Sequence, residues 1–242
     1  MTVEAQSAIS ARLTPATIDA LLGYAARATW PSGFVIYQRG VQADGVFIVL
    51  EGRVVLRSRV RAGRAFIPWI ATAFETFGAE GLSSVPHYST EARADEETTT
   101  LFLSAARYRS FLREQPQAAT ALMAQILSER SALLEKLREL TTMSVEQRLV
   151  VALLRLATFA SFTREDGCIV LNTSRYRLLC ELVGATRESV SLVLGRFSGE
   201  GLMERKGTSL IDRPRRLSSR MEVQPLYDLL SPAASLATSQ VV

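Results

Sequence analysis

The chain has 242 residues, of which 48% are hydrophobic and 21% are charged, and its formal net charge is +4. It is long enough for one large or two ordinary domains, and no apolar run approaches the roughly 18 residues of a membrane-spanning helix. Its N-terminus lacks the basic start and apolar stretch of a signal peptide, so we expect a cytoplasmic protein with no membrane partner.

The segment from about Trp30 to Leu103 carries the signals of several short strands. In it β-branched and aromatic residues alternate with polar ones, and glycines separate the runs. The runs are FVIY, VFIVLEG, RVVLRSRV and AFIPWIA, separated by Gly33, Gly40, Gly45, Gly52 and Gly63. This spacing predicts an antiparallel sandwich or barrel. We expect the polar run around Glu96 and Glu97 to form a solvated hairpin.

A helical region follows. Ser104–Glu114 is predicted to form a short helix that ends at Pro116. The next segment, Gln117–Thr141, has neither proline nor glycine and is long enough for about seven turns. It carries a wide apolar stripe made of Ala119, Leu122, Met123, Ile126, Leu127, Leu133, Leu134, Leu137 and Leu140.

The width of this stripe predicts two neighbours for the long helix, its own barrel and a second copy of the chain. We therefore hypothesise a homodimer through residues 119–140. Glu129 and Lys136 occupy d positions of the heptad formed by Ala119, Ile126, Leu133 and Leu140. Charged residues at these positions argue against an extended coiled coil and favour a helix–helix interface that only partly follows the heptad pattern. The alternative is one helix buried inside a monomer.

A new helix is predicted to begin at a capping box, in which Ser144 and Gln147 satisfy each other's backbone groups. The domain boundary is placed just before it. Further on, two short amphipathic stretches between Asn172 and Phe197 meet at Gly184. The glycine is expected to adopt positive φ at the end of the first helix, and Thr186 to cap the second. The pattern is that of a helix-turn-helix, with an ordinary helical hairpin as the alternative.

The second stretch is followed by GLMERKGTSLIDRPRRL, which is predicted to form two short strands turning near Lys206–Thr208. Between Thr173 and Arg220 the chain has ten basic and five acidic residues, a net +5, as expected of a surface that neutralises phosphates. The predicted domains are 1–116 for the barrel, 117–143 for the long helix and hinge, 144–222 for the DNA-binding part and 223–242 for a tail.

Barrel, long helix, capped helix, helix-turn-helix and wing, in this order, resemble the CRP/FNR family of bacterial transcription regulators. The resemblance is carried by Pro31-x-Gly33, Gly40, Asp44-Gly45-x-Phe47-Ile48-x-x-x-Gly52, Phe77-Gly78-x-x-Gly81-Leu82 and Leu179-Cys180-x-Leu182-Val183-Gly184-x-x-Arg187-Glu188-Ser189-Val190. It implies an α+β fold with an N-terminal cyclic-nucleotide-binding-like antiparallel β-barrel (jelly roll), a long dimerisation helix and a C-terminal winged helix-turn-helix. It also implies a palindromic site on double-stranded DNA and RNA polymerase as a partner.

The resemblance assigns the DNA contacts. Relatives read the edges of a G·C pair with the arginine and glutamate that match Arg187 and Glu188, and we add Ser191 as a base contact. The next reader position, often arginine in the family, is Leu192 here. Backbone contacts are expected from Thr186, Ser189, Arg175, Tyr176, Arg177, Arg205 and Lys206.

The effector pocket departs from the family. Cyclic-AMP binders hold the ribose with a glutamate, the cyclic phosphate with an Arg-Ser pair and the adenine with polar residues of the long helix. The matching positions here are Ala79, Tyr88-Ser89 and Leu133-Leu134. The cyclic phosphate and the adenine edge would find no hydrogen-bond partners at these positions, at a cost on the order of 1–3 kcal/mol for each group. We therefore expect no response to cyclic AMP. The candidate pocket consists of Gly78, Glu80, Tyr88, Ser89, Arg130, Leu133 and Leu134.

Three interpretations of this pocket remain open: its own side chains fill it, a different small molecule binds it, or a ligand binds elsewhere. Arg130 lies in the apolar stripe, where an anion such as cyclic di-GMP or a partner's carboxylate would meet it; the alternative is a snorkelling side chain paired with Glu129 or Glu135. No cofactor is expected, because one histidine, His87, and two cysteines do not supply a haem, iron–sulfur or metal site.

The sequence also bears on two other function classes. A sensory module that acts on a protein partner would not need the basic residues of the wing. An enzyme is disfavoured because we find no nucleophile with a neighbouring base, no phosphate-binding glycine loop of the P-loop type and no metal-ligand cluster.

Overall fold

The structure, a computed structural model, describes residues 12–59, 65–84, 86–157, 159, 162, 169–206 and 209–212. Its packing divides the chain into two compact units, Ser10–Leu134 and a second unit that contains the chain from Glu135 onward. The division falls inside the longest helix rather than after residue 143, where the sequence placed it. Within the described ranges no helix has the length and apolar character needed to span a membrane.

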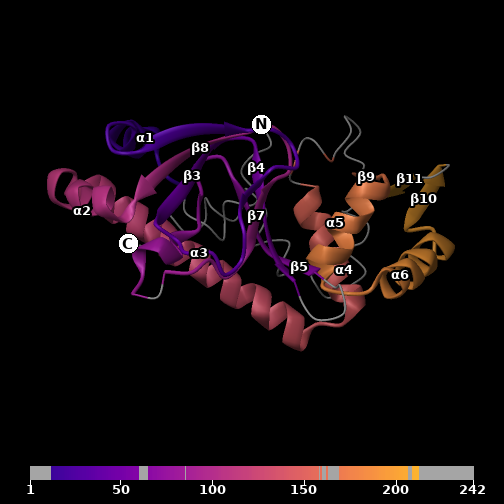
Figure 1. Cartoon of the computed structure of the whole chain (residues 1–242). Coiled ribbons are helices and arrows are strands. Elements are labelled where there is room, and N and C mark those ends of the chain that lie inside the picture. Colours follow the sequence, from indigo (N-terminus) through magenta and orange to yellow (C-terminus); the bar gives the residue numbers. More distant parts are fainter. Residues whose placement is uncertain are drawn as a thin grey trace, which may run out of the picture. The chain divides into compact units, whose positions relative to one another are not determined.

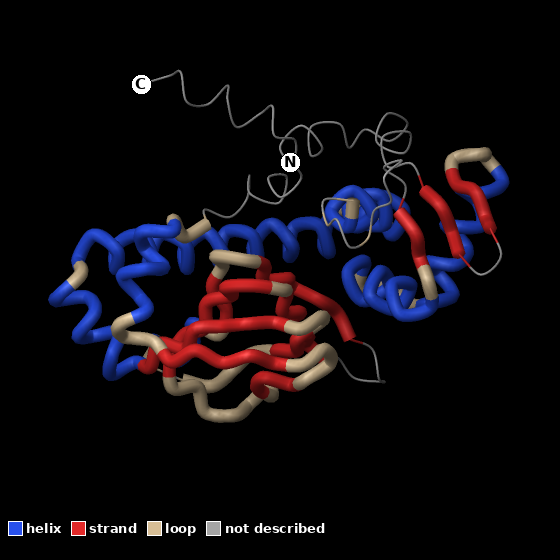
Figure 2. The backbone as a smooth tube through the Cα atoms, turned by 90° about the horizontal axis from the view of Figure 1, so that it is seen from above, coloured by secondary structure: helices blue, strands red, loops and turns tan. Residues whose placement is uncertain are grey.

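The first unit is a two-sheet antiparallel β-structure with three helices, which confirms the predicted jelly-roll type of fold (Figures 1 and 2). One sheet has the strand order β1-β8-β3-β6 and the other β2-β7-β4-β5. The elements are α1 (Pro15–Leu22), β1 (Ala26–Trp30), β2 (Val35–Tyr37), β3 (Gly45–Glu51), β4 (Arg53–Arg59), β5 (Ala65–Thr72), β6 (Thr76–Phe77), η2 (Ala79–Leu82), β7 (Glu91–Ala94), β8 (Thr98–Ser104), α2 (Ala105–Glu114) and the first part of α3 (Pro116–Thr142).

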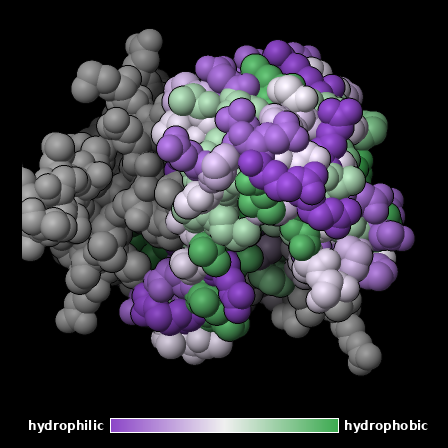
Figure 3. Space-filling model, turned by 90° about the vertical axis from the view of Figure 1, so that its left-hand side faces the viewer, coloured by the Kyte–Doolittle hydropathy of each residue, from purple (hydrophilic) through white to green (hydrophobic). Residues whose placement is uncertain are grey.

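The helices of this unit cover one face of the β1-β8-β3-β6 sheet. Ile48 and Leu101, on the paired strands β3 and β8, share a buried cluster with Leu21 of α1, Phe111 of α2 and Leu122 of α3. Helix α1, which was not predicted from the sequence, is capped by Thr14 and begins at Pro15. Other hydrophobic side chains reach the surface, where they form patches among hydrophilic ones (Figure 3).

The expected hairpin around Glu96 and Glu97 is wrong. The strands on either side of it, β7 and β8, belong to different sheets, so the segment crosses from one sheet to the other. The buried Arg53 holds this crossing, because its guanidinium donates two hydrogen bonds, of 2.6 and 3.0 Å, to one carboxylate oxygen of Asp95. A buried guanidinium needs such a partner, so the acidic run stabilises the fold.

The side of α3 that faces β6 is polar. Gln125 is 1% exposed and Glu129 8% exposed, and both bind Thr76. The Thr76 backbone N–H donates to Gln125 Oε1 at 3.1 Å, and the Thr76 hydroxyl donates to Glu129 Oε2 at 3.1 Å. The residue at the predicted d position 129 therefore contacts its own barrel.

In its described residues the second unit contains the end of α3, three more helices and a three-stranded sheet. Its elements are α4 (Val145–Leu156), β9 (Ile169–Leu171), α5 (Thr173–Val183), α6 (Arg187–Gly199), β10 (Met203–Lys206) and β11 (Ser209–Asp212), with the strand order β10-β11-β9. The capping box of Ser144 and Gln147 is confirmed, and so is the strand pair after α6. Strand β9, which pairs with β11, was not predicted.

A buried charged network joins the last turns of α3 to the rest of this unit. Lys136 Nζ donates to Glu139 Oε2 at 3.1 Å and to the backbone oxygen of Leu182 at 2.6 Å. Glu139 also accepts two hydrogen bonds from Arg155 of α4. Because the Leu182 carbonyl lies in the last turn of α5, this lysine supplies a donor that the helix itself lacks there. The network explains why the packing assigns Glu135–Thr142 to the second unit.

The buried carboxyl of Glu129 makes stability depend on pH. Burial raises its pKa to about 8 from the usual 4.5. Between these two values the folded chain keeps a proton that the unfolded chain has lost, so stability falls as pH rises, by at most about 1.4 kcal/mol per pH unit. We expect Glu129→Gln, which cannot titrate, to flatten this decline in urea unfolding curves measured from about pH 5 to pH 8.5. The exposed control Glu51→Gln keeps the wild-type slope, and an equally steep slope in Glu129→Gln would contradict the assignment.

Candidate functional site

The turn between α5 and α6 has the predicted geometry. Gly184 adopts φ +65°, and its backbone N–H donates to the Cys180 oxygen at 3.0 Å, which ends α5. A Cβ at this position would lie 2.9 Å from Leu140 Cδ2 of α3. The positive φ is what requires glycine here, because the Leu140 methyl is the end of a flexible side chain that can move aside.

Thr186 caps helix α6 as predicted, because its hydroxyl accepts the Ser189 backbone N–H at 3.2 Å. The predicted apolar face of the helix is buried and consists of Val190, Val193, Leu194 and Phe197. Arg187, Glu188 and Ser191 are exposed. The expected outward position of these three side chains is confirmed, and the first turn of α6 presents a cation and an anion side by side.

Both charged residues of this turn are held in place. The Arg187 guanidinium lies over the Tyr176 ring, 5.4 Å from its centroid, and the Tyr176 hydroxyl donates to the Arg187 backbone oxygen at 3.3 Å. Hydrogen bonds from its own backbone N–H and from the Thr186 hydroxyl lower the pKa of Glu188. At neutral pH it is therefore a carboxylate, the form that accepts a hydrogen bond from a cytosine amino group.

The residues expected to contact the DNA backbone have different surroundings. Arg177 is exposed, with Glu181 3.9 Å away. Arg175 is committed to the fold, because its guanidinium donates to the Val170 oxygen at 2.9 Å and lies over the Phe162 ring. A phosphate contact by Arg175 would compete with these interactions. The side chains of Arg205 and Lys206 lie outside the described residues.

The residues predicted from the cyclic-nucleotide cassette lie close together in the barrel. Gly78 has φ +71°, and a Cβ there would lie 3.0 Å from the Tyr37 ring and 3.1 Å from the Tyr88 ring. These two rings stack with centroids 3.6 Å apart and planes 7° apart. The aromatic pair thus packs directly against the cassette glycine. The sequence analysis did not identify Tyr37 as part of this site.

The carboxylate of Glu80 occupies the polar part of the cassette. It accepts the backbone N–H of Ser89 at 3.1 Å and the Ser89 hydroxyl at 2.5 Å through the same oxygen. These are the donors that an external anion would use at this position. The chain therefore places an anion of its own where the serine presents its hydrogens.

The three predicted pocket residues of α3 are less buried than the two residues of the helix that bind the barrel. Arg130 and Leu134 are exposed and Leu133 is half-buried, whereas Gln125 and Glu129 face the barrel. The proposed pairing of Arg130 is also wrong. Glu129 is buried against Thr76, and the Glu135 carboxylate binds Arg138, accepting from its Nε at 2.9 Å. Within the described part of the chain, Arg130 has no carboxylate partner.

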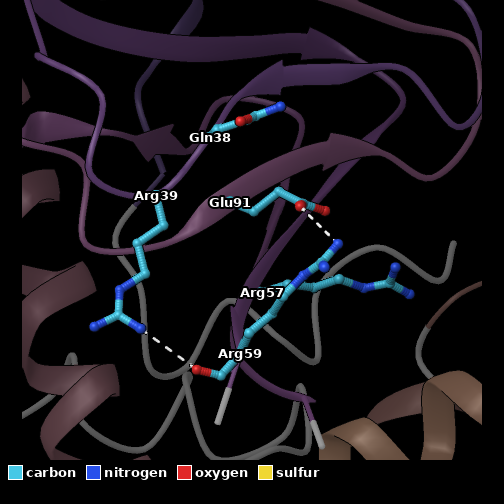
Figure 4. A pocket seen from close by; sticks show the side chains of 5 residues that line it. All are labelled: Gln38, Arg39, Arg57, Arg59 and Glu91. Carbon is cyan, nitrogen blue, oxygen red and sulfur yellow. Dashed lines mark hydrogen bonds and ion pairs between the residues drawn. The ribbon is translucent and has the colours of Figure 1, made fainter. Parts of the chain in front are cut away.

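The barrel also contains a pocket lined by arginines. This pocket of about 300 Å³ is lined by Gln38, Arg39, Arg57, Arg59 and Glu91 (Figure 4). The Arg59 guanidinium points toward Glu91, with 3.4 Å between the paired atoms, and Arg39 donates to the Arg59 backbone oxygen. Three guanidinium groups and one carboxylate make the pocket electropositive, so a bound molecule would be anionic. None of the predicted effector residues lines it. In the described segments no three histidine, cysteine or acidic residues form a group that could hold a metal ion.

Two protein families match this chain. The cyclic nucleotide-binding domain family matches residues 27–115, and the Crp-like helix-turn-helix domain family matches residues 147–220. The first range contains the two β-sheets and the cassette, and the second contains the capped helix α4, the helix-turn-helix and the wing.

Similar proteins cover most of the chain. The cyclic AMP receptor protein of Thermus thermophilus is 30% identical over 197 residues, which are 79% of this chain and 85% of that protein. A CRP-like cAMP-activated global transcriptional regulator of Mycobacterium tuberculosis is 25% identical over 218 residues, 89% of this chain and 97% of that protein. The solved structure of the c-di-GMP responsive global regulator CLP of Xanthomonas campestris shares the fold, with a TM-score of 0.72, 20% identity and coverage of 82% of this chain and 99% of that one. This chain therefore belongs to the CRP/FNR family of DNA-binding transcription regulators.

Proposed function

We propose that this regulator binds a two-fold symmetric DNA site as a homodimer, with α6 of each protomer in the major groove, and that cyclic AMP is not its effector. The observation that carries the first part is the exposed first turn of α6, where Arg187 and Glu188 stand at the positions of the family motif. Arginine recognises guanine through two acceptors and glutamate accepts from cytosine, so the pair suits the two sides of a G·C pair.

The dimer proposal rests on the outward side of α3. Met123, Leu127, Leu134 and Leu137 are 42%, 55%, 59% and 57% exposed, and they follow one another at intervals of four, seven and three residues. This spacing keeps them on one stripe of the helix. The predicted heptad that starts at Ala119 faces partly inward, since that residue is 1% exposed. The outward stripe is therefore the surface that a second copy of α3 would bury.

Arg130 occupies the middle of this stripe, between Leu127 and Leu134. In a parallel two-fold seam, a residue in the middle of the stripe approaches the same residue of the second protomer. Two guanidinium groups would then lie near each other, which costs dimer stability but restricts the helices to one register. The same position would attract an anionic ligand at the dimer axis.

The proposal about cyclic AMP departs from the names of the relatives, several of which are cAMP-activated regulators. It is supported by Glu80, whose carboxylate already binds the Ser89 donors, and by Tyr88, which stacks on Tyr37 where the family has an arginine. A cyclic phosphate would have to displace a negative group without gaining a guanidinium. Of the three interpretations of the pocket, filling by the chain's own side chains agrees best with these contacts.

The reading role of Arg187 is tested by substitution. A binding site is first selected from a random duplex pool with the wild-type chain. We expect Arg187→Ala to lose about 1–3 kcal/mol of binding free energy on that site in gel shifts, because the bidentate contact is removed. The exposed Arg109→Ala on α2 serves as the control and keeps wild-type affinity. An unchanged affinity of Arg187→Ala would contradict the assignment.

The dimer seam is tested by adding charge to it. The double variant Leu134→Glu, Leu137→Glu places carboxylates on an exposed stripe, so the protomer stays folded while the seam is disrupted. We expect sedimentation equilibrium at micromolar concentration to give twice the chain mass of 26.6 kDa for the wild type and a single chain mass for the variant. Leu112→Glu, at another exposed apolar position, remains dimeric. A monomeric wild type would refute the seam.

The absence of cyclic-AMP control is tested by ligand addition. We expect micromolar cyclic AMP to leave both the melting temperature and the affinity for the selected DNA site unchanged, as 5′-AMP does, because a ligand that does not bind the folded chain cannot stabilise it. A rise in melting temperature with cyclic AMP alone would overturn this part of the proposal.

A further inference from the structure

We propose that Leu192 reads the 5-methyl group of a thymine in the major groove and so determines the base preference at one position of each half-site. The inference rests on the proposed function, in which α6 enters the major groove. Unlike Arg187 and Glu188, Leu192 would discriminate between bases without forming a hydrogen bond.

The exposure of Leu192 is unusual within the fold. It is 78% exposed, more than any other large hydrophobic side chain in the described part of the chain. Its neighbours Val193 and Leu194 are 9% and 2% exposed and supply the packing of α6 against its own unit. Leu192 thus contributes almost nothing to folding, and its apolar surface becomes buried only when another molecule covers it.

The position of Leu192 on α6 places it beside the polar readers. It follows Glu188 by four residues, so the two share one side of the helix, and Ser191 is adjacent. Four residues advance a helix by about 6 Å, a distance of roughly two base-pair steps. Leu192 would therefore meet a base pair close to the one that Arg187 and Glu188 read.

One turn further along, Gly195 leaves the same side of α6 open. It is exposed, and a Cβ built on it would meet no atom within 4 Å, so the fold itself does not require glycine there. The missing side chain lets the wall of a groove approach the helix beyond Leu192. This allows the leucine to reach the base edges without a bulky neighbour that holds the helix away.

The chemistry of the major groove then selects the ligand of Leu192. A leucine has neither donor nor acceptor, and the thymine methyl is the apolar group that the groove offers. Cytosine at the same position would lack the methyl group that the leucine covers. Thymine is therefore the base that the side chain favours.

The test removes the methyl group without changing the base pairing. Each thymine of the selected half-site is replaced in turn by deoxyuridine, and the dissociation constant is measured by gel shift. We expect the wild type to bind one substituted duplex about three- to fivefold more weakly, the factor for one buried methyl group. Leu192→Ala, an exposed substitution, binds the thymine and uracil duplexes equally at that position. Leu112→Ala on α2 keeps the wild-type difference.

The outcomes separate this inference from the proposed function. A wild type that selects a DNA site but binds every deoxyuridine duplex as tightly as the thymine duplex refutes the role of Leu192 and leaves DNA reading by α6 intact. A thymine preference that persists in Leu192→Ala also refutes it, because another residue then makes the contact. A random pool that yields no enriched site overturns the proposed function and this inference together.

Discussion

The contacts of the long helix α3 determine which of its sides remains available. Its inward side carries Gln125 and Glu129, which bind Thr76 in the barrel, and Lys136, which binds the last turn of α5. Buried polar groups need specific partners, so these contacts hold the rotation of the helix about its axis more strictly than an apolar face would. The apolar side chains that remain outside then form one stripe, with Arg130 in its middle.

The same constraint bears on the effector end of the barrel. Glu129 lies near Glu80, since the negative charge of Glu80 contributes to the raised pKa of Glu129. Glu80 in turn holds Ser89, and Tyr88 stacks on Tyr37 beside Gly78. These contacts connect α3 to the cassette through the chain's own residues. According to our proposal, these side chains fill the space in which cAMP-activated relatives bind their nucleotide.

The DNA-reading end is built from local contacts between α5 and α6. Tyr176 binds both the guanidinium and the backbone oxygen of Arg187, and Thr186 caps the helix. The first turn of α6 is therefore ordered before any DNA arrives, which lowers the entropy cost of binding. Leu192 differs from these residues because its side chain is 78% exposed among the residues that the structure describes.

Features set by neighbours along the chain were predicted from the sequence alone. The capping box at Ser144, the positive φ of Gly184 and the apolar face of α6 depend on residues three to four positions apart, so the pattern itself specifies them. The family motif added the cassette and the reader positions.

Other features were decided only by the tertiary structure. The inward orientation of Glu129, the crossing held by Arg53 and the stacking of Tyr37 on Tyr88 join residues about 40 to 50 positions apart. Strand order and the choice between two apolar sides of one helix depend on such distant partners, which no local pattern specifies. For that reason the sequence predicted a wide stripe on α3, and the structure divided it into a side that faces the chain itself and a side left free.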